Sequence, residues 1–259
     1  MLKGKFLTVM LTEIRSLFVF ALLLLIMGGC ENSSSDVAAG QGGSMARFAI
    51  QDQHLYVANN KTIEVFSING DSFTKVGEVA VGLGLETIFA RGEYLYLGAN
   101  DAMYIYSIAE PTTPVFVFRY SHIASCDPVV VQGTRAYVTL RSGSICNRGV
   151  NALEILDISD PYNPRLISNY PMTSPHGLAV SGDYLFLCEG EAGLKVFDIS
   201  DETNIKQLTS RNDFFAFDVI AAQHKITVTG EDGIFQFAYP QEGEFLKFLS
   251  KIPVERDQL

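Results

Sequence analysis

The chain has 259 residues, of which 47% are apolar and 19% charged, with 22 Gly and 9 Pro. This composition can supply a sizeable core and excludes a disordered chain. The 19 basic and 29 acidic residues give a net charge of −10, so we expect no nucleic-acid partner and no purely electrostatic hold on anionic lipid.

The first 29 residues have the features of a secretory signal. Lys3, Lys5 and Arg15 precede the apolar run 17–27, whose end is marked by small residues. A helix of that length rises about 16 Å, which is short of the roughly 30 Å hydrocarbon core of a bilayer. The pattern therefore predicts export and not a membrane span.

The sequence Met27-Gly28-Gly29-Cys30 directly follows the apolar run and resembles the bacterial lipobox. The resemblance implies that Cys30 is diacylated and that residues 1–29 are removed just ahead of it. Two or more acyl chains give a stable membrane hold, which a single chain does not. The alternative is a plain signal with an incidental cysteine.

The residues after Cys30 indicate where the protein goes. Glu31 resembles the sorting pattern that directs lipoproteins away from the inner membrane, so we expect a cell-envelope protein anchored in the outer membrane, facing the periplasm or the cell surface. Residues 30–44 are rich in Gly and Ser without an apolar period, which predicts a flexible tether.

One sequence unit recurs five times between residues 45 and 259, which we expect to form a single domain. Segments that align in this way end at positions 40, 41, 49 and 41 residues apart: Leu55-Tyr56-Val57, Leu95-Tyr96-Leu97, Ala136-Tyr137-Val138, Leu185-Phe186-Leu187 and Ile226-Thr227-Val228. The fourth unit predicts strands over 177–180, 184–188, 194–199 and 205–208, joined by turns rich in Gly, Ser and Asp. No helical period with start and stop signals follows Cys30.

Four strands in about 41 residues, repeated five times, predict an all-β fold: a five-bladed β-propeller of four-stranded antiparallel blades. A single blade cannot bury both of its faces, so neighbouring blades are expected to stack and close a ring. The alternative is an open sandwich of many strands, which would need no such period.

One phrase of the repeat is specific enough to suggest a family. Leu153-Glu154-Ile155-Leu156-Asp157-Ile158-Ser159-Asp160-Pro161 recurs closely at 194–201 and in weaker form at 103–111. This resembles the LVIVD-repeat family of β-propeller proteins, found among exported and surface proteins, and the resemblance implies a fold without implying a reaction. Units one and five depart from the phrase. We interpret its Asp and Ser residues as turn formers that bond nearby backbone.

Polar residues recur where the inner strand of each unit begins. Glu86, Asp127 and His176 stand at equivalent positions, and Asp218 is one place away in the fifth unit. In a propeller these positions converge on the mouth of the central channel, where they could bind a polar ligand or a structural cation. The alternative is that they are ordinary solvated or turn-forming residues. We expect no metal centre and no other cofactor, because one His with scattered carboxylates is not a metal signature.

The third unit is longer than the others because of an insertion in 141–151. This loop carries Cys146, and Cys126 lies in another loop of the same unit on the same expected face. An oxidising envelope favours a Cys126–Cys146 disulfide. Cys188, which ends a strand, is expected to be a buried thiol.

No hydrolase, metalloprotease or phosphate-loop motif occurs in the sequence. The sequence therefore favours a binding or interaction module, held at the membrane through lipid on Cys30, with a protein or glycan partner, and not an enzyme. The alternative is an envelope hydrolase or lyase that uses Glu86, Asp127 and His176 at the channel mouth.

Overall fold

A computed structural model of the chain describes residues 43–121, 128–142, 150–240 and 244–254. The chain divides into the units Met1–Ala38 and Ala39–Leu259, and every described residue belongs to the second. The signal region, Cys30, Cys126, Asp127 and Cys146 lie outside the described residues. Within the described ranges no helix is long and apolar enough to cross a membrane.

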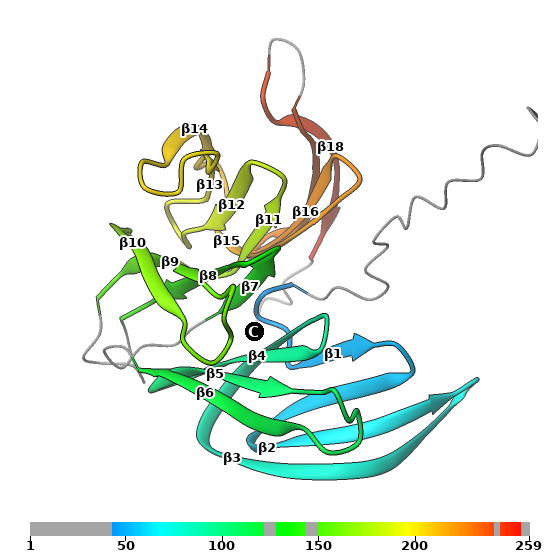
Figure 1. The fold of residues 1–259 in the computed structure, drawn as a ribbon. Helices are drawn as coiled ribbons and strands as arrows, with labels where there is room; N and C mark the ends of the chain where they lie inside the picture. The colour runs from blue at the N-terminus through cyan, green and yellow to red at the C-terminus, as the bar shows by residue number, and fades with distance from the viewer. Residues whose placement is uncertain (1–42, 122–127, 143–149, 241–243, 255–259) are drawn as a thin grey trace, which may run out of the picture. The chain divides into compact units, whose positions relative to one another are not determined.

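The described residues form eighteen strands and no helix, in four antiparallel sheets (Figure 1). The first sheet holds β1 (Phe48–Gln51), β2 (His54–Asn69), β3 (Ser72–Arg91), β4 (Tyr94–Ala99), β5 (Ala102–Ser107) and β6 (Val115–Ser121). The second holds β7 (Val129–Gln132), β8 (Arg135–Leu140), β9 (Ala152–Asp157) and β10 (Arg165–Pro171). The third holds β11 (Leu178–Ser181), β12 (Tyr184–Cys188), β13 (Leu194–Asp198) and β14 (Lys206–Arg211). The fourth holds β15 (Ala216–Ala222), β16 (Lys225–Gly230), β17 (Gly233–Ala238) and β18 (Lys247–Pro253).

The first sheet has six strands because two sequence units run together in it. The part of β3 over 72–80 pairs with β2, and the part over 85–91 pairs with β4. Within β2, Asn60 has a φ of 39°. The N–H of Ile68, later in β2, donates a hydrogen bond to the carbonyl of Gln53 at 2.8 Å, and in the third sheet the N–H of Ile199 donates to the carbonyl of Asp183 in the same way. The expected all-β fold of four-stranded antiparallel units is confirmed, except that the first two units share one sheet.

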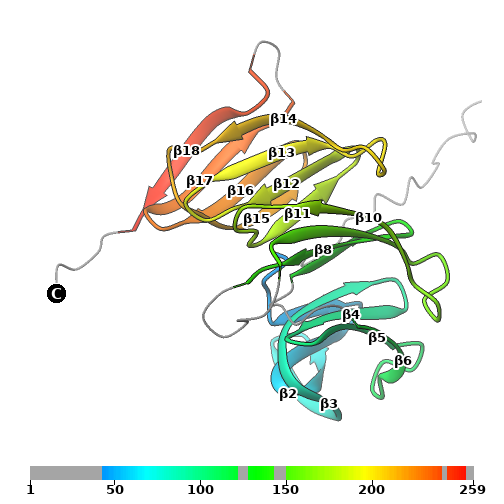
Figure 2. The same ribbon diagram turned by 90° about the vertical axis from the view of Figure 1, so that its left-hand side faces the viewer.

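Alternate residues of each unit pack toward its two neighbours, because successive side chains of a strand point to opposite faces. Tyr56 and Leu97 belong to one core cluster, which joins the first unit to the second. A second cluster joins units two, three and four, and a third joins units four and five through Phe186 and Val228. Figures 1 and 2 show the sheets following one another in this order.

The two terminal units bury only one face each. Position 57 of the first unit is partly exposed, whereas its equivalents Leu97, Val138, Leu187 and Val228 are all 0% exposed. In the fourth sheet, Ile220 and Ile234 are 38% and 39% exposed. Among the described residues no core cluster joins the last sheet to the first, so the ring closure expected from the repeat is not made by sheet packing.

The acids of the repeat phrase form turns, as the sequence predicted. Asp157 accepts a hydrogen bond from the N–H of Ser159 at 2.9 Å, and Asp198 accepts the equivalent bond from Ser200 at 2.9 Å. Hydrogen bonds from the backbone and side chain of Ser159 hold the pKa of Asp157 below the usual range, and bonds from the side chain and backbone of Ser200 do the same for Asp198. The sequence phrase therefore has a structural cause that is independent of any ligand.

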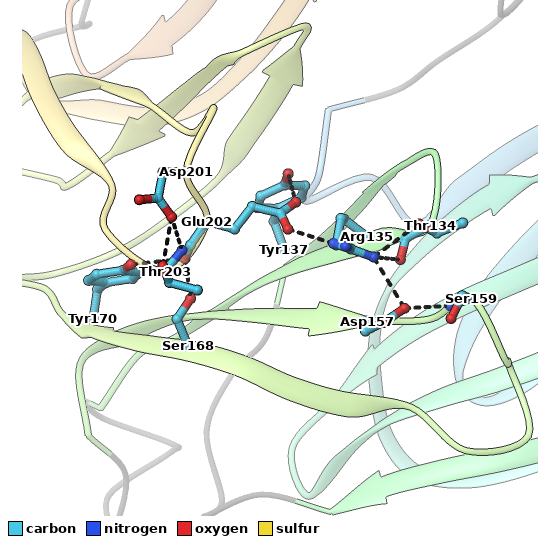
Figure 3. Close-up of polar contacts among 10 residues, drawn as sticks. All are labelled: Thr134, Arg135, Tyr137, Asp157, Ser159, Ser168, Tyr170, Asp201, Glu202 and Thr203. Carbon is cyan, nitrogen blue, oxygen red and sulfur yellow. Dashed lines mark hydrogen bonds and ion pairs between the residues drawn. The ribbon is translucent and has the colours of Figure 1, made fainter.

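A network of hydrogen bonds and ion pairs connects the second sheet to the third (Figure 3). The Glu202 carboxylate accepts hydrogen bonds from Arg135 Nε at 2.6 Å and from the Tyr137 hydroxyl at 3.3 Å. The Glu202 carbonyl accepts two more, from Ser168 and Tyr170 at 2.7 and 2.9 Å. One residue of the fourth unit thus contacts two strands of the third unit, β8 and β10.

Candidate functional site

His176 lies just before β11, where segments of the second, third and fourth sheets meet. Its side chain is buried, with 8% of the residue exposed. Nδ1 lies 2.7 Å from the carbonyl of Ser174, and Nε2 lies 3.2 Å from Arg141 Nη1. Because a carbonyl only accepts and a guanidinium only donates, Nδ1 carries the proton and Nε2 is an acceptor. The geometry therefore selects neutral imidazole.

Aromatic rings and backbone hold this imidazole in place. The rings of Phe215 and Phe217 contact it edge-on, with centroids 5.7 and 6.2 Å away. Gly190 passes so close that a Cβ there would lie 2.9 Å from the ring. Burial, with a contribution from the charge of Arg141, lowers the pKa of His176.

This pKa shift predicts a loss of stability on acidification. The unfolded state takes up a proton near pH 6.5, whereas folded His176 resists protonation, so the free energy of unfolding should fall as the pH drops through 6.5. Denaturant titrations between about pH 7.5 and 5.5 should show a smaller decrease for His176→Gln. His224→Gln, at an exposed turn, is the matched control for the loss of an imidazole; equal decreases for His176→Gln and the native protein would contradict the prediction.

Arg141, at the start of the long loop, retains unused donors. A guanidinium has five N–H groups, and His176 Nε2 accepts one of them. In the part of the chain that the structure describes, no carboxylate pairs with Arg141. By contrast, Arg119 is bonded to Asp101 at 2.6 Å and Arg211 to Asp213 at 2.8 Å. Arg141 is thus a cation held in place by a neutral ring and able to bind an anion.

Glu189, next to this site, lies in the interior. It is 0% exposed and forms an ion pair with Lys195. Its Oε1 accepts a hydrogen bond from the N–H of Thr173 at 2.9 Å. The carboxylate is therefore committed to holding the loops around His176 and is not available to a ligand.

Asp218 is also closed off, by the segment that precedes β1. It accepts hydrogen bonds from Ser44 Oγ at 3.1 Å and from the N–H of Val219 at 2.9 Å. Ser44 Oγ in turn accepts from the N–H of Leu178 at 2.7 Å. A Cβ at Gly43 or Gly177 would come within 2.0 Å of this carboxylate. Burial raises the pKa of Asp218.

The structure describes three of the four predicted channel-mouth residues. His176 pairs with Arg141, Asp218 pairs with Ser44, Glu86 lies within β3, and Asp127 is outside the described residues. No three described His, Cys, Asp or Glu side chains gather closely enough to bind a metal ion. The predicted buried thiol is confirmed, since Cys188 is 0% exposed and burial raises its pKa.

A cavity of about 420 Å³ lies elsewhere, between the second and third units, lined in part by Tyr94, Tyr96, Ser159 and Pro161. At the next junction Glu202 stands at the sequence position of Pro161 and accepts a hydrogen bond from Arg135 (Figure 3).

The repeated sheets and their packing define a propeller-like repeat protein. Three segments match the LVIVD repeat family, at residues 86–122, 147–172 and 175–211. The LVIVD repeat that the sequence phrase suggested is therefore confirmed in the second, third and fourth units.

Solved structures with the same fold share little sequence with this chain. A functionally unknown protein from Desulfotomaculum acetoxidans aligns with a TM-score of 0.68 and 10% identity, over 80% of this chain and 69% of its own. The periplasmic gluconolactonase PpgL of Pseudomonas aeruginosa gives 0.62 and 14%, over 78% and 68%. A putative 6-phosphogluconolactonase from Bacteroides fragilis gives 0.63 and 13%, over 80% and 70%. A comparison with curated proteins found no match.

Proposed function

We propose that this protein is an envelope-anchored binding module whose five repeats form five propeller blades and whose ligand carries a carboxylate or phosphate that binds at Arg141 and His176. The observation that carries the proposal is the guanidinium of Arg141, which donates to neutral His176 and has no carboxylate partner among the described residues. Hydrogen bonds from a guanidinium to an anion are charge-assisted and about twice as strong as neutral ones.

The surroundings of the site support recognition more than reaction. The acids nearest to His176 are already used, because Glu189 is paired with Lys195 and Asp218 with Ser44. Among the described residues no carboxylate pairs with Arg141, so this fixed cation could bind an anion, whereas hydrolysis ordinarily requires a general acid–base pair. Because the net charge of the protein is −10, long-range electrostatic attraction does not draw an anionic ligand to it. The contact of the ligand with Arg141 must therefore supply the selectivity.

The N-terminal features of the sequence support an anchor of this module in a membrane. The lipobox-like sequence ending in Cys30 would supply the acyl anchor, and residues 31–44 would separate the sheets from the lipid surface. A module held in this way would present its loops to a soluble or cell-surface ligand in the envelope.

Calorimetric titration with D-gluconate and with inorganic phosphate tests the ligand class. We expect binding by the native protein and at least tenfold weaker binding by Arg141→Gln, since hydrogen bonds to a charged group contribute about 1.5–3 kcal/mol. Arg119→Gln is the matched control, because that guanidinium already has Asp101 as its partner. Equal affinity of Arg141→Gln and the native protein, or no heat with either anion, would overturn the proposal.

A second candidate is lactone hydrolysis, which the names of two similar structures raise. Nε2 of neutral His176, once released from its bond to Arg141, could accept a proton from water as that water adds to the lactone carbonyl, while Arg141 would stabilise the oxyanion. Ring opening would then expel the ring oxygen, which would take the proton back from the imidazolium and give the hydroxy acid. Acid release from glucono-1,5-lactone, followed in a pH-stat, separates the two functions. A rate above buffer that is lost in both His176→Gln and Arg141→Gln would establish the hydrolase, and the buffer rate alone would leave the binding module.

A further inference from the structure

The two end units of the repeat each expose one sheet face, and these faces correspond to the two sides of the internal junctions. We call the face of the first unit that has no preceding unit the leading face; Phe48 is paired across it with Val57, and Ile50 with Leu55. We call the face of the last unit that has no following unit the trailing face; it contains Ile220, Thr227 and Gln236 in one row and Ile234 and Ile252 in the next.

Neither face belongs to a core cluster of the described chain. Phe48 is 50% exposed, and Ile234 and Ile252 are 39% and 64% exposed. The alternate residues of the same strands are buried, as Tyr56 at 0% and Val228 at 0% show. The exposure is therefore a property of the faces and not of loosely packed strands.

Each internal junction is built in the same way. The trailing face of one unit packs on the leading face of the next, as Tyr96 with Val138 and Phe186 with Val228 show. By position in the repeat, Thr227 corresponds to Tyr96 and Phe186, and Val57 corresponds to Val138 and Val228. The two exposed faces are thus the two halves of one further junction of the kind that the chain already makes.

The exposed charges of the two faces are also complementary. On the leading face Glu64 and Glu78 are paired across the strands and share Lys75; Glu64 alternates with the buried Ile63 and Val65 and so points outward with Val57. On the trailing face the charged side chains that the described strands expose are Lys225 and Lys247, both opposite Ala238.

We infer that copies of this protein associate head to tail, with the trailing face of one copy packing on the leading face of another. This goes beyond the proposed ligand site and does not depend on it. Thr227 and Gln236 replace the apolar residues of the internal junctions, so the contact is less apolar than a core junction and is reversible. A head-to-tail contact leaves one free face at each end, so assembly continues into short chains or a closed ring.

Co-purification of two differently tagged full-length copies, extracted from membranes in mild detergent, tests the association. Native copies should co-purify. Two copies that both carry Ile234→Asp should not, because neither has an intact trailing face, and two copies that both carry Phe48→Asp should not, because neither has an intact leading face. One Ile234→Asp copy and one Phe48→Asp copy should co-purify again, since one leading and one trailing face remain intact.

This complementation separates the inference from other causes of co-purification. Recovery in all combinations would indicate a shared micelle, recovery in none would indicate a single copy whose own faces close or stay solvated, and either result overturns the inference. Ile252→Asp provides a second trailing-face variant at a more exposed position, and thermal unfolding verifies that each variant is folded. Val115→Asp, 61% exposed on the outer strand β6, is the control that should co-purify like the native protein.

Discussion

Replacing Lys195 by methionine is expected to lower the free energy of unfolding by about 3 kcal/mol. Glu189 is 0% exposed and pairs with Lys195, so the substitution leaves a buried carboxylate without its cation, which typically costs about 3–5 kcal/mol when both charges are buried. Because Lys195 retains 21% side-chain exposure, we expect the lower end of that range. Urea denaturation followed by circular dichroism measures the loss.

The double variant Glu189→Leu with Lys195→Met tests whether the loss of stability comes from the unpaired carboxylate. Removing both charges removes the desolvation penalty, so the double variant should be more stable than Lys195→Met alone. Lys247→Met, at an exposed position of β18, should change stability by less than about 0.5 kcal/mol. A double variant less stable than the single one would show that Glu189 does not depend on Lys195.

Replacing Cys30 by alanine is expected to abolish acylation. The native protein should incorporate labelled palmitate. Its mature chain should begin at Cys30 and have a mass that includes the lipid. In Cys30→Ala the label should fall to background and the protein should accumulate as a precursor that retains residues 1–29, because the Cys30 thiol is the group that is acylated. The variant Cys188→Ala, at the buried thiol, should keep the label; label that persists in Cys30→Ala would contradict the anchor.

The repeat could be derived from the sequence because a period near 41 residues leaves little choice of fold. Strands predicted at 184–188 and 194–199 lie at 184–188 and 194–198, and the turn role of Asp157 and Asp198 follows from their side-chain bonds to backbone. These features depend on residues near one another in the chain, which a sequence pattern records directly.

The candidate site could be predicted only in part, because it depends on contacts between units. His176 was found from its position at the start of an inner strand, but Arg141 was not, since it comes 35 positions earlier and meets Nε2 only when two sheets pack. Asp218 was expected at the channel mouth, whereas Ser44, which covers it, comes 174 positions earlier. The exposed end faces were missed because the repeat pattern specifies how each unit packs on the next and not whether the last meets the first.

A crystal structure of the mature protein soaked with D-gluconate tests most directly whether Arg141 and His176 bind the anionic group of a ligand. The proposal predicts density for the carboxylate within about 3 Å of the Arg141 guanidinium, with His176 still bonded to Arg141 and the density lost in crystals of Arg141→Gln. Gluconate bound at the cavity beside Tyr94 and Tyr96, or Arg141 paired with a carboxylate of its own chain, would contradict it.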